Sequence, residues 1–586
     1  MSVNEGKRQK RIKRLKRKLL PSLLAGFSLP ITLFLYGPFD LFAQNRSELN
    51  FSLYDFLLPC ILLTVTCGAI LSAIALILRR KVYSVYLAVL FWASVMFYVQ
   101  GSYLNLGYTK LSADGISEPT PIIIVILNAV LWLLTLGAVI FLVLKLKPVR
   151  KKLKGVVSLV LAIVIFMECV GVVAVSFEAG VYDTREDVLA SDMDGVGVKM
   201  LTTKNMTTLS KDRNVLVFLV DRFDADYFEK AQREVPELLG ELDGFTYYSD
   251  HVSLYARTFP AVTHLLTGVE KDAQTKRRAY FKEAYESAEY LRYMDSQGYG
   301  VNVYTSDFYA YENAVHMDGY VQNVTTYESY EIVDKYELVS SMIAFSLYRY
   351  FPFFLKGTVD YIGSDTFDGL VKFEGAEDEE KYTTDNKNVY NELISKDFTL
   401  TDESGRFTFL HIDGCHGPSS YDGDFSELDK QSWDTIGMMT QTFKIINRYI
   451  SEMKRLGVYE SSTIVITGDH ASAVSDSKPV EDSRITAFLL KPSGSNDGEI
   501  RVSKAQTCHD DIWRTVFESE GLEGYPATCG ESVIGLGEDV ARDRRYVFHR
   551  IDGDTTEEII YRITGNARDF SNWTVESRRD IPKIYK

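Results

Sequence analysis

Carboxylate and imidazole side chains stand just after three apolar runs in the part of the chain that follows residue 177. The runs lie at 214–220, 407–412 and 463–467, and a short turn separates the second from its histidine. Both groups are ligand types for divalent cations. The residues are Asp221, His416, Asp469 and His470. Metal binding is the first chemistry that these residue types indicate.

A threonine in the same part of the chain is placed to meet an anion. Thr258 lies in the sequence ARTFPAVTHLLTG, just before a predicted helix with Pro260 in its first turn, where proline is favoured. The amino terminus of a helix attracts anions such as a phosphoryl group. A helix cap is the structural alternative for Thr258, since threonine is a usual capping residue.

Short apolar runs alternate with helical patterns around these residues. Continuous apolar runs of this length are typical of strands in a sheet that is buried on both faces. They lie at 214–220, 300–305, 407–412, 463–467 and 485–490, and the helical patterns lie at 280–296, 337–349 and 431–456. The alternation predicts an α/β domain with a mostly parallel central sheet. Reactive groups in such sheets collect at the carboxyl ends of the strands, where the candidate residues lie.

Four segments in this order resemble the alkaline phosphatase and sulfatase superfamily. They read NVLVFLVD, RTFPAVTHLLTG, FTFLHIDGCHGPSSYD and STIVITGDH. Together with the apolar segments that precede them, they are similar to the membrane-anchored lipoteichoic acid synthases and lipid A phosphoethanolamine transferases. The resemblance implies an alkaline phosphatase-like fold and the transfer of a phosphoalcohol group from a phospholipid.

The resemblance also implies a role for each candidate residue. One divalent metal, Mn²⁺ or Zn²⁺, is expected on Asp221, Thr258, Asp469 and His470. Thr258 is expected to attack phosphorus, and His416 to contact the substrate phosphate or the leaving group. A metal explains the threonine, because a cation can stabilise its alkoxide at neutral pH. A second metal, on Asp413, His416 and His509, is the less favoured alternative.

Departures from the resembled families narrow the expected reaction. Sulfatases carry Cys or Ser where this chain has Thr258, and a basic residue four places on, where this chain has Val262. Sulfate-ester cleavage is therefore disfavoured. Lipoteichoic acid synthases usually have Glu in place of Asp221, and their aromatic-Trp-Asn-Arg element is not found here. These differences favour simple transfer over polymer synthesis.

The first 177 residues have the composition of a membrane domain. They hold 20 Lys and Arg and 7 Asp and Glu, a net charge of +13; since the whole chain carries −15, residues 178–586 carry −28. Five apolar stretches, near 20–42, 53–78, 82–107, 121–144 and 155–177, approach the ~20 residues needed to cross a bilayer. Because Pro30, Gly37, Pro38 and Asp40 interrupt the first, a kinked or re-entrant segment is its alternative. Basic residues favour a cytoplasmic amino terminus and an extracytoplasmic second half.

These patterns predict five regions. They are a basic cytoplasmic tail (1–18), a five-span domain (19–178), a linker (179–210), the catalytic domain (211–538) and a C-terminal β-hairpin appendage (539–586). Within them, Glu168 in the fifth span is either functional or a paired carboxylate. The aromatic stretch 341–355 is either an interfacial segment near the lipid donor or a buried helix edge.

The sequence therefore predicts a multi-pass plasma-membrane enzyme with a phospho-threonine intermediate. The expected donor is a membrane phospholipid carrying phosphoglycerol or phosphoethanolamine, and the expected acceptor is a cell-envelope glycan or lipid. A membrane-tethered phosphatase or phosphodiesterase is the alternative, and a sensor that only binds is a third. Nucleic acid is a poor partner, because the acidic half has no basic stripe to neutralise phosphates.

Overall fold

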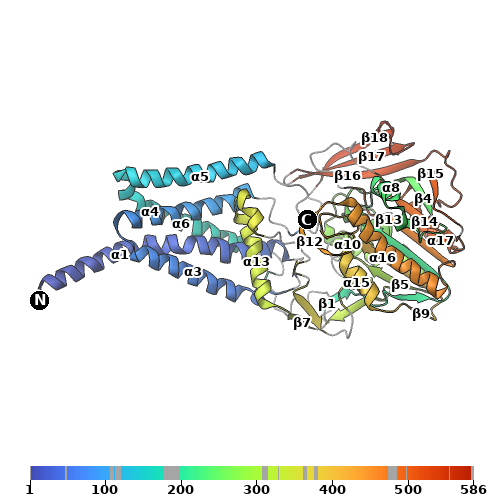
Figure 1. Ribbon diagram of the computed structural model, residues 1–586, viewed down its shortest axis with the longest axis horizontal. Coiled ribbons are helices and arrows are strands. Elements are labelled where there is room, and N and C mark those ends of the chain that lie inside the picture. Colours follow the sequence, from blue (N-terminus) through green and yellow to red (C-terminus); the bar gives the residue numbers. More distant parts are fainter. Residues whose placement is uncertain are drawn as a thin grey trace. The chain divides into compact units, whose positions relative to one another are not determined.

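The computed structural model divides into two compact units, which are described separately. The first contains Met1–Val198 and Tyr327–Gly375, and the second contains Lys199–Thr326 and Ala376–Lys586 (Figure 1). The structure describes residues 2–46, 49, 51–105, 111, 121–176, 181–182, 198–306, 314–327, 329–359, 366–367, 369–374, 380–472, 485–496, 498–552 and 555–581. Most of the predicted linker 179–210 lies outside these ranges.

Seven strands form the central sheet of the second unit, in the order β15-β4-β14-β13-β3-β10-β5. Their bounds are β3 (Asn214–Val220), β4 (Thr246–Val252), β5 (Tyr299–Tyr304), β10 (Gly405–Ile412), β13 (Ser462–Gly468), β14 (Phe488–Lys491) and β15 (Arg501–Cys508). β14 is antiparallel to both of its neighbours, whereas the other pairs are parallel. The predicted α/β domain with a mostly parallel sheet is confirmed.

Two strands of this sheet have no continuous apolar run. β4 has the sequence TYYSDHV and β15 has RVSKAQTC, so polar residues interrupt both. β15 lies at an edge, where its first residues are exposed. An edge strand buries less of its surface and needs fewer apolar residues, which explains β15. β4 lies between β15 and β14 and is mostly buried, but Ser249, Asp250 and His251 interrupt its apolar run.

Helices cover both faces of the sheet. One face packs on α8 (Ala225–Glu234), α15 (Asn386–Ser395) and α16 (Thr435–Leu456); the other packs near α9 (Thr258–Thr267), α10 (Arg277–Ser287), α11 (Glu289–Ser296) and α17 (Asp511–Ser519). Phe218 of β3 meets Tyr449 of α16 at a ring distance of 5.6 Å. On the opposite face, Phe407 of β10 stacks on Trp513 of α17 at 5.2 Å. The strand ends are thus fixed by a core on each side.

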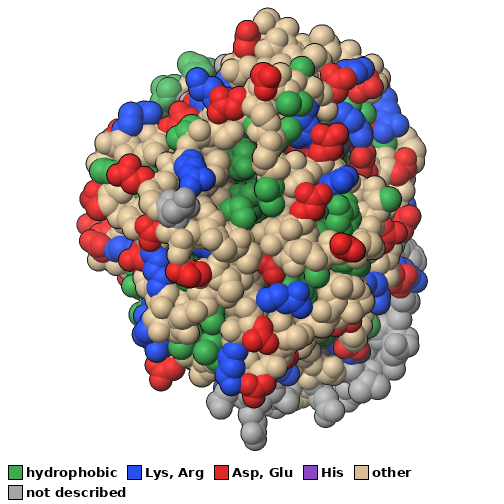
Figure 2. Space-filling view, turned by 90° about the vertical axis from the view of Figure 1, so that its right-hand side faces the viewer, with side chains coloured by type: hydrophobic (Ala, Val, Ile, Leu, Met, Phe, Trp, Pro, Cys, Tyr) green, Lys and Arg blue, Asp and Glu red, His purple; other side chains and the backbone are tan. Residues whose placement is uncertain are grey.

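Shorter strands complete the second unit. β1 (Val198–Leu201) pairs with β6 (Val324–Tyr327), β2 (Thr208–Ser210) with β9 (Thr399–Thr401), and β11 (Ser419–Tyr421) with β12 (Glu427–Ser432). The predicted C-terminal hairpin is present as β16 (Asp543–Asp552) and β17 (Thr555–Thr564), and β18 (Trp573–Ile581) extends it to three antiparallel strands. Short helical turns are η6 (Pro236–Leu239), η7 (Ala314–Met317) and η10 (Phe570–Asn572). Acidic and basic side chains are interspersed over the face in Figure 2, as on a solvated surface.

Five helices of the first unit, among its described residues, are long and apolar enough to cross a membrane. They are Leu15–Gln44, Leu57–Ile77, Arg80–Leu104, Ile122–Lys145 and Lys147–Val175. They comprise α1 (Ser2–Pro30), η1 (Ile31–Tyr36), α2 (Gly37–Gln44), α3 (Leu57–Ile77), α4 (Arg80–Val99), η4 (Gln100–Leu104), α5 (Ile122–Lys145) and α6 (Lys147–Val175), and η3 (Leu53–Asp55) precedes α3. Five apolar helices of this kind fit a membrane anchor.

The first of these helices continues through its interruption. After Pro30 the chain forms a π-helical turn, η1, before α2 begins at Gly37. A proline inside a helix removes a backbone hydrogen bond, and a π turn is one local adjustment to that loss. Glu168 of α6 lies opposite this turn and accepts a hydrogen bond from Thr32 of η1. Glu168 is therefore buried and hydrogen-bonded at one of its two oxygens, which is compatible with either expectation for it.

A segment inserted between two parts of the second unit belongs to the first unit, with the apolar helices. It consists of β7 (Ser329–Ile332), α13 (Lys335–Tyr350), η8 (Phe353–Thr358) and β8 (Val371–Glu374), with β7 and β8 antiparallel. The aromatic stretch 341–355 lies in it. Phe351 meets Phe97 at a ring distance of 5.7 Å, and Phe354 meets Trp132 at 6.4 Å. These aromatic rings therefore pack on the apolar helices.

Polar contacts fix the insertion in place. Arg349 of α13 forms a buried ion pair with Asp40 of α2. Asn105 donates to the main-chain carbonyls of Arg349 and Phe351, and the Phe353 N–H donates to Asn128 at 3.1 Å. Removing one partner of a buried ion pair costs about 3–5 kcal/mol. The insertion and the helices should therefore form one folding unit.

This packing makes a truncation experiment informative. We expect the fragment 199–586 to aggregate, because it exposes the apolar side of α13. The same fragment with 327–375 replaced by a short Gly-Ser linker should be monomeric. Such a linker can close the gap, because Thr202 N–H donates to Asn323 and Thr203 N–H to Glu380, which places both flanks together. Size-exclusion chromatography compares the two. A monomeric unmodified fragment would contradict the assignment of the insertion.

Candidate active site

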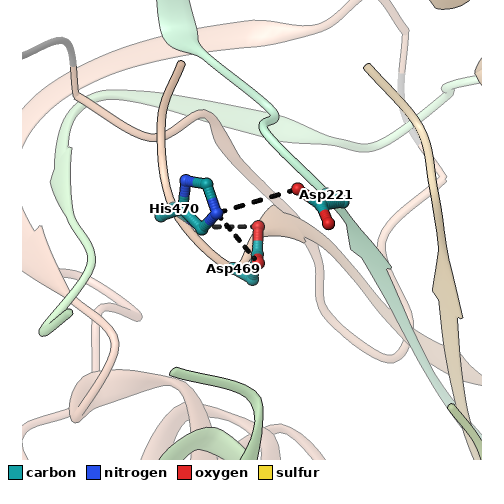
Figure 3. Close-up of side chains that lie close together, drawn as sticks. All are labelled: Asp221, Asp469 and His470. Atoms are coloured by element: carbon teal, nitrogen blue, oxygen red, sulfur yellow. Dashed lines mark hydrogen bonds and ion pairs between the residues drawn. The ribbon is translucent and has the colours of Figure 1, made fainter. Parts of the chain in front are cut away.

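Two neighbouring parallel strands carry three of the candidate residues at their carboxyl ends. Asp221 follows β3, and Asp469 and His470 follow β13. Val220 is opposite Gly468 in the register of the two strands, so the residues after them emerge side by side. Figure 3 shows the three side chains converging. All three are buried, and one ligand atom of each lies within 4.8 Å of the others.

The imidazole of His470 presents its Nε2 atom to both carboxylates. Nε2 lies 3.7 Å from Asp221 Oδ1 and 3.4 Å from Asp469 Oδ2. The other ring nitrogen, Nδ1, lies 2.6 Å from the carbonyl oxygen of Ala471. A carbonyl only accepts hydrogen bonds, so we assign the proton to Nδ1, which leaves a lone pair on Nε2. This is how proteins commonly orient a metal-binding histidine.

The two oxygens of Asp469 have different surroundings. Oδ1 accepts the main-chain N–H groups of Arg222 at 3.1 Å and His470 at 2.7 Å. Oδ2 is fully buried and has no hydrogen-bond donor in the described part of the chain. A buried carboxylate oxygen without a donor is costly, and a cation is the usual compensation. The residues therefore fit a divalent metal.

Thr258 brings its hydroxyl to the same cluster from a different element. Its Oγ1 lies 3.2 Å from His470 Nε2 and 3.4 Å from Asp221 Oδ2. Thr258 begins α9, although Phe259 and Pro260 depart from helical backbone angles, so the regular turns start after the proline. The structure thus assembles all four predicted metal-site residues, Asp221, Thr258, Asp469 and His470.

His416 does not belong to the ligand group of this cluster. It follows β10, and its N–H donates to Asp413 at 2.8 Å. Burial lowers the pKa of the neighbouring His411 to about 4; Asp469 opposes the shift, whereas His470 and His416 add to it. Among the described residues, Asp413, His416 and His509 do not form a second metal-ligand group.

One residue of the site was not anticipated. Arg222, directly after Asp221, has a left-handed backbone with φ of 54° and gives its N–H to Asp469. This conformation costs a residue with a side chain about 1–2 kcal/mol. Such strain persists only where the surroundings impose it. Sequence does not show a positive φ at an arginine, so no signal could have identified it.

Comparison with known protein families shows to which family the chain belongs. The sulfatase family profile matches residues 213–521, more than half of the chain. The chain belongs to the sulfatase family. This sulfatase-family protein contains each candidate site residue inside the matched region. The expected relationship to the alkaline phosphatase and sulfatase superfamily is confirmed, and members of that superfamily are enzymes. No curated protein matches the sequence.

Solved structures similar to this sulfatase-family protein are distant. A Vibrio parahaemolyticus protein of the alkaline phosphatase superfamily is 11% identical, with a TM-score of 0.37 over 66% of this chain and 85% of its own. The lipoteichoic acid synthase LtaP from Listeria monocytogenes is 14% identical, with a TM-score of 0.36 over 62% of this chain and 86% of its own. The phosphonate monoester hydrolase SpPMH from Silicibacter pomeroyi is 13% identical, with a TM-score of 0.37 over 63% of this chain and 89% of its own. At these values none of them indicates the reaction.

Loss of a ligand should lower metal content. We expect Asp469→Asn and His470→Ala each to reduce the bound Mn²⁺ or Zn²⁺ by more than about tenfold, because either change removes one of four donors. Elemental analysis of purified protein after dialysis measures this. Asp429→Asn, an exposed carboxylate on β12, is the control and should keep full occupancy. Full occupancy in both site variants would contradict the ligand assignment.

Buried histidines predict a loss of stability in mild acid. Burial holds the pKa of His251 well below its ordinary value, with His509, Arg544 and Arg542 adding to the shift. Burial also lowers the pKa of His549, against the opposing charge of Glu558. Such a histidine has a pKa of about 6.5 in the unfolded chain and a lower pKa in the folded protein. Its full contribution to stability is present above about pH 6.5. That contribution is lost as the pH falls from about 6.5 toward the folded-state pKa, because the unfolded chain then binds a proton that the folded protein does not. The melting temperature should therefore fall steadily below about pH 6.5. His251→Gln, if folded, should flatten this dependence; an unchanged slope would exclude His251 as a contributor.

Proposed function

We propose that this protein transfers a phosphoalcohol group, phosphoglycerol or phosphoethanolamine, from a membrane phospholipid to a cell-envelope glycan or lipid. The observation that supports it is Thr258 Oγ1 at 3.2 Å from His470 and 3.4 Å from Asp221, in a chain with five apolar helices. A hydroxyl among metal ligands suits attack on phosphorus. An apolar anchor keeps the enzyme at its lipid donor.

The proposed metal site consists of Asp221, Thr258, Asp469 and His470, with Mn²⁺ or Zn²⁺ as the cation. When bound, the cation would stabilise the threonine alkoxide and neutralise phosphoryl oxygens. Two carboxylates and one imidazole suit either metal. The main-chain N–H groups on Asp469 and the carbonyl on His470 fix these side chains before substrate arrives. Such preorganisation lowers the cost of reaching the transition state.

The reaction divides into two displacements at phosphorus. In the first, Thr258 Oγ bonds to phosphorus while the bond to the diacylglycerol oxygen breaks. Asp221 Oδ2 accepts the threonine proton, and His416 gives a proton to the departing diacylglycerol. In the second, the acceptor hydroxyl gives its proton to His416 and bonds to phosphorus. The phospho-Thr258 bond then breaks, and the threonine regains its proton from Asp221.

The proposed location follows from charge and hydropathy. Basic residues at the amino terminus, at 79–81 and at 145–154 favour the cytoplasmic side, which puts the catalytic unit outside the plasma membrane. Donor phospholipid is available at the outer leaflet, and envelope glycans and lipids are accessible there. Water as the acceptor would make the same site a phosphatase or phosphodiesterase.

Replacement of the nucleophile tests the proposal. We expect Thr258→Ala to lose more than about 10³-fold in turnover, because it removes the attacking atom. Thr258→Ser should retain measurable activity. Thr267→Ala, on the same helix and outside the site, should behave as wild type. The assay incubates full-length protein with labelled phosphatidylglycerol or phosphatidylethanolamine and follows diacylglycerol release.

Mass spectrometry of the stopped reaction should find phosphoalcohol on Thr258 in the wild type. Wild-type turnover by Thr258→Ala would exclude the mechanism. Release of free phosphoalcohol in the presence of envelope acceptors, with no labelled acceptor formed, would favour the hydrolase.

A further inference from the structure

The C-terminal sheet pairs with the chain segment that leads to Thr258. This nucleophile segment, residues 253–257, connects β4 to the start of α9. Val547 of β16 donates its N–H to Leu254 at 2.7 Å, and its carbonyl accepts the Ala256 N–H at 3.2 Å. Tyr255 and Val547 form a parallel bridge. A strand almost 300 residues away thus extends beside the segment. Figure 1 shows this C-terminal sheet in red.

Side chains fix the end of the segment nearest to Thr258. Arg257, the residue before the nucleophile, donates from its guanidinium to the carbonyl of His549 at 3.3 Å. The His549 ring stacks on Tyr255 at 6.3 Å, with 11° between the planes. His549 Nε2 lies 3.2 Å from a Glu558 oxygen on β17. The position of Arg257 is therefore coupled to the interior of the C-terminal sheet.

Arg544 of β16 binds β4 just before the segment begins. It is 1% exposed. Its guanidinium lies 2.9 and 3.2 Å from the two carboxylate oxygens of Asp250, and donates to the Asp250 carbonyl at 2.7 Å. It also donates to the carbonyls of Thr507 on β15 and Gly565 after β17. Asp250 lies on β4, only three residues before the nucleophile segment. The Arg544 guanidinium thus links β4, β15 and the C-terminal sheet.

We propose that the C-terminal sheet positions the nucleophile, and that Arg544 is its main positioning residue. The inference rests on the proposed function and deepens it. Thr258 reaches the metal-site residues from a connecting segment, whereas Asp221 and Asp469 follow central strands. A displacement of about 1 Å in a reacting group can cost 10²-fold in rate. β16 pairs with the middle of the segment, His549 contacts its end at Arg257, and Arg544 binds Asp250 on the strand that leads into it.

The sheet has apolar contacts that should persist without Arg544. Tyr546, Phe548, Ile559, Tyr561 and Ile563 form a cluster with Val252, Ala256 and Trp573. Loss of the guanidinium should therefore loosen the attachment of β16 to β4 and leave the C-terminal sheet folded. Among the described residues, Arg544 forms no hydrogen bond with β3 or β13, the strands that lead to the proposed metal ligands. Metal binding should remain intact.

Two neighbouring arginines provide a matched test in the full-length protein. Arg545, the next residue of β16, pairs with Glu270, and both side chains are almost half exposed, so its loss costs little. We expect Arg544→Met to lower kcat for a soluble diester, bis(p-nitrophenyl) phosphate, by about 10- to 100-fold, with KM and metal content within about twofold. Arg544→Lys should recover part of the rate. Arg545→Met should match the wild type.

Hydrogen exchange provides a readout independent of turnover. In Arg544→Met, amides at 253–257 and 546–549 should exchange at least about tenfold faster, whereas β13 should be unchanged. His549→Gln should show the same pattern with a smaller loss of kcat. Unchanged kcat and exchange in both variants would overturn the proposal. So would faster exchange of β13 in both, since the residues would then support the whole fold. A wild type inactive on every phosphodiester would refute the proposed function, while exchange at 253–257 would still test positioning.

Discussion

Two buried carboxylates facing one imidazole are the constraint on which this site depends. Asp221 and Asp469 would repel each other at the ends of β3 and β13 without a positive charge between them. Their strands are adjacent and parallel, so the fold forces them together. Two main-chain N–H groups donate hydrogen bonds to Oδ1 of Asp469, whereas Oδ2 faces His470. A divalent cation would offset this repulsion, and under the proposed function it would stabilise the Thr258 alkoxide.

The surrounding structure can be understood as support for that cluster. Cores on both faces of the sheet hold the two strand ends, and the Ala471 carbonyl sets the orientation of His470. Thr258 requires different support, because it lies on a connecting segment. The C-terminal sheet supplies it through main-chain pairing at Val547 and the buried ion pair between Arg544 and Asp250. Elements from distant parts of the sequence thus converge on one hydroxyl.

The predictable parts of this protein are those whose signal is local. Asp221 and the Asp469-His470 pair follow continuous apolar strands, so the strands and the positions of these three residues at the strand ends could be predicted. β4 and β15 lacked such a run and were missed. The pairing of β16 with residues 254–256 was also invisible, because parallel pairing across almost 300 residues leaves no local pattern. The packing of α13 on the apolar helices could not be foreseen either: an aromatic helix has the same sequence whether it covers a sheet or a membrane anchor.

The most direct test of the account is a crystal structure of the protein with Mn²⁺, with anomalous scattering recorded at the manganese edge. The account predicts one strong peak surrounded by Asp221, Thr258, Asp469 and His470, with oxygen and nitrogen ligands at about 2.0–2.3 Å. A peak held by other residues, or none between the two carboxylates at saturating Mn²⁺, would contradict it.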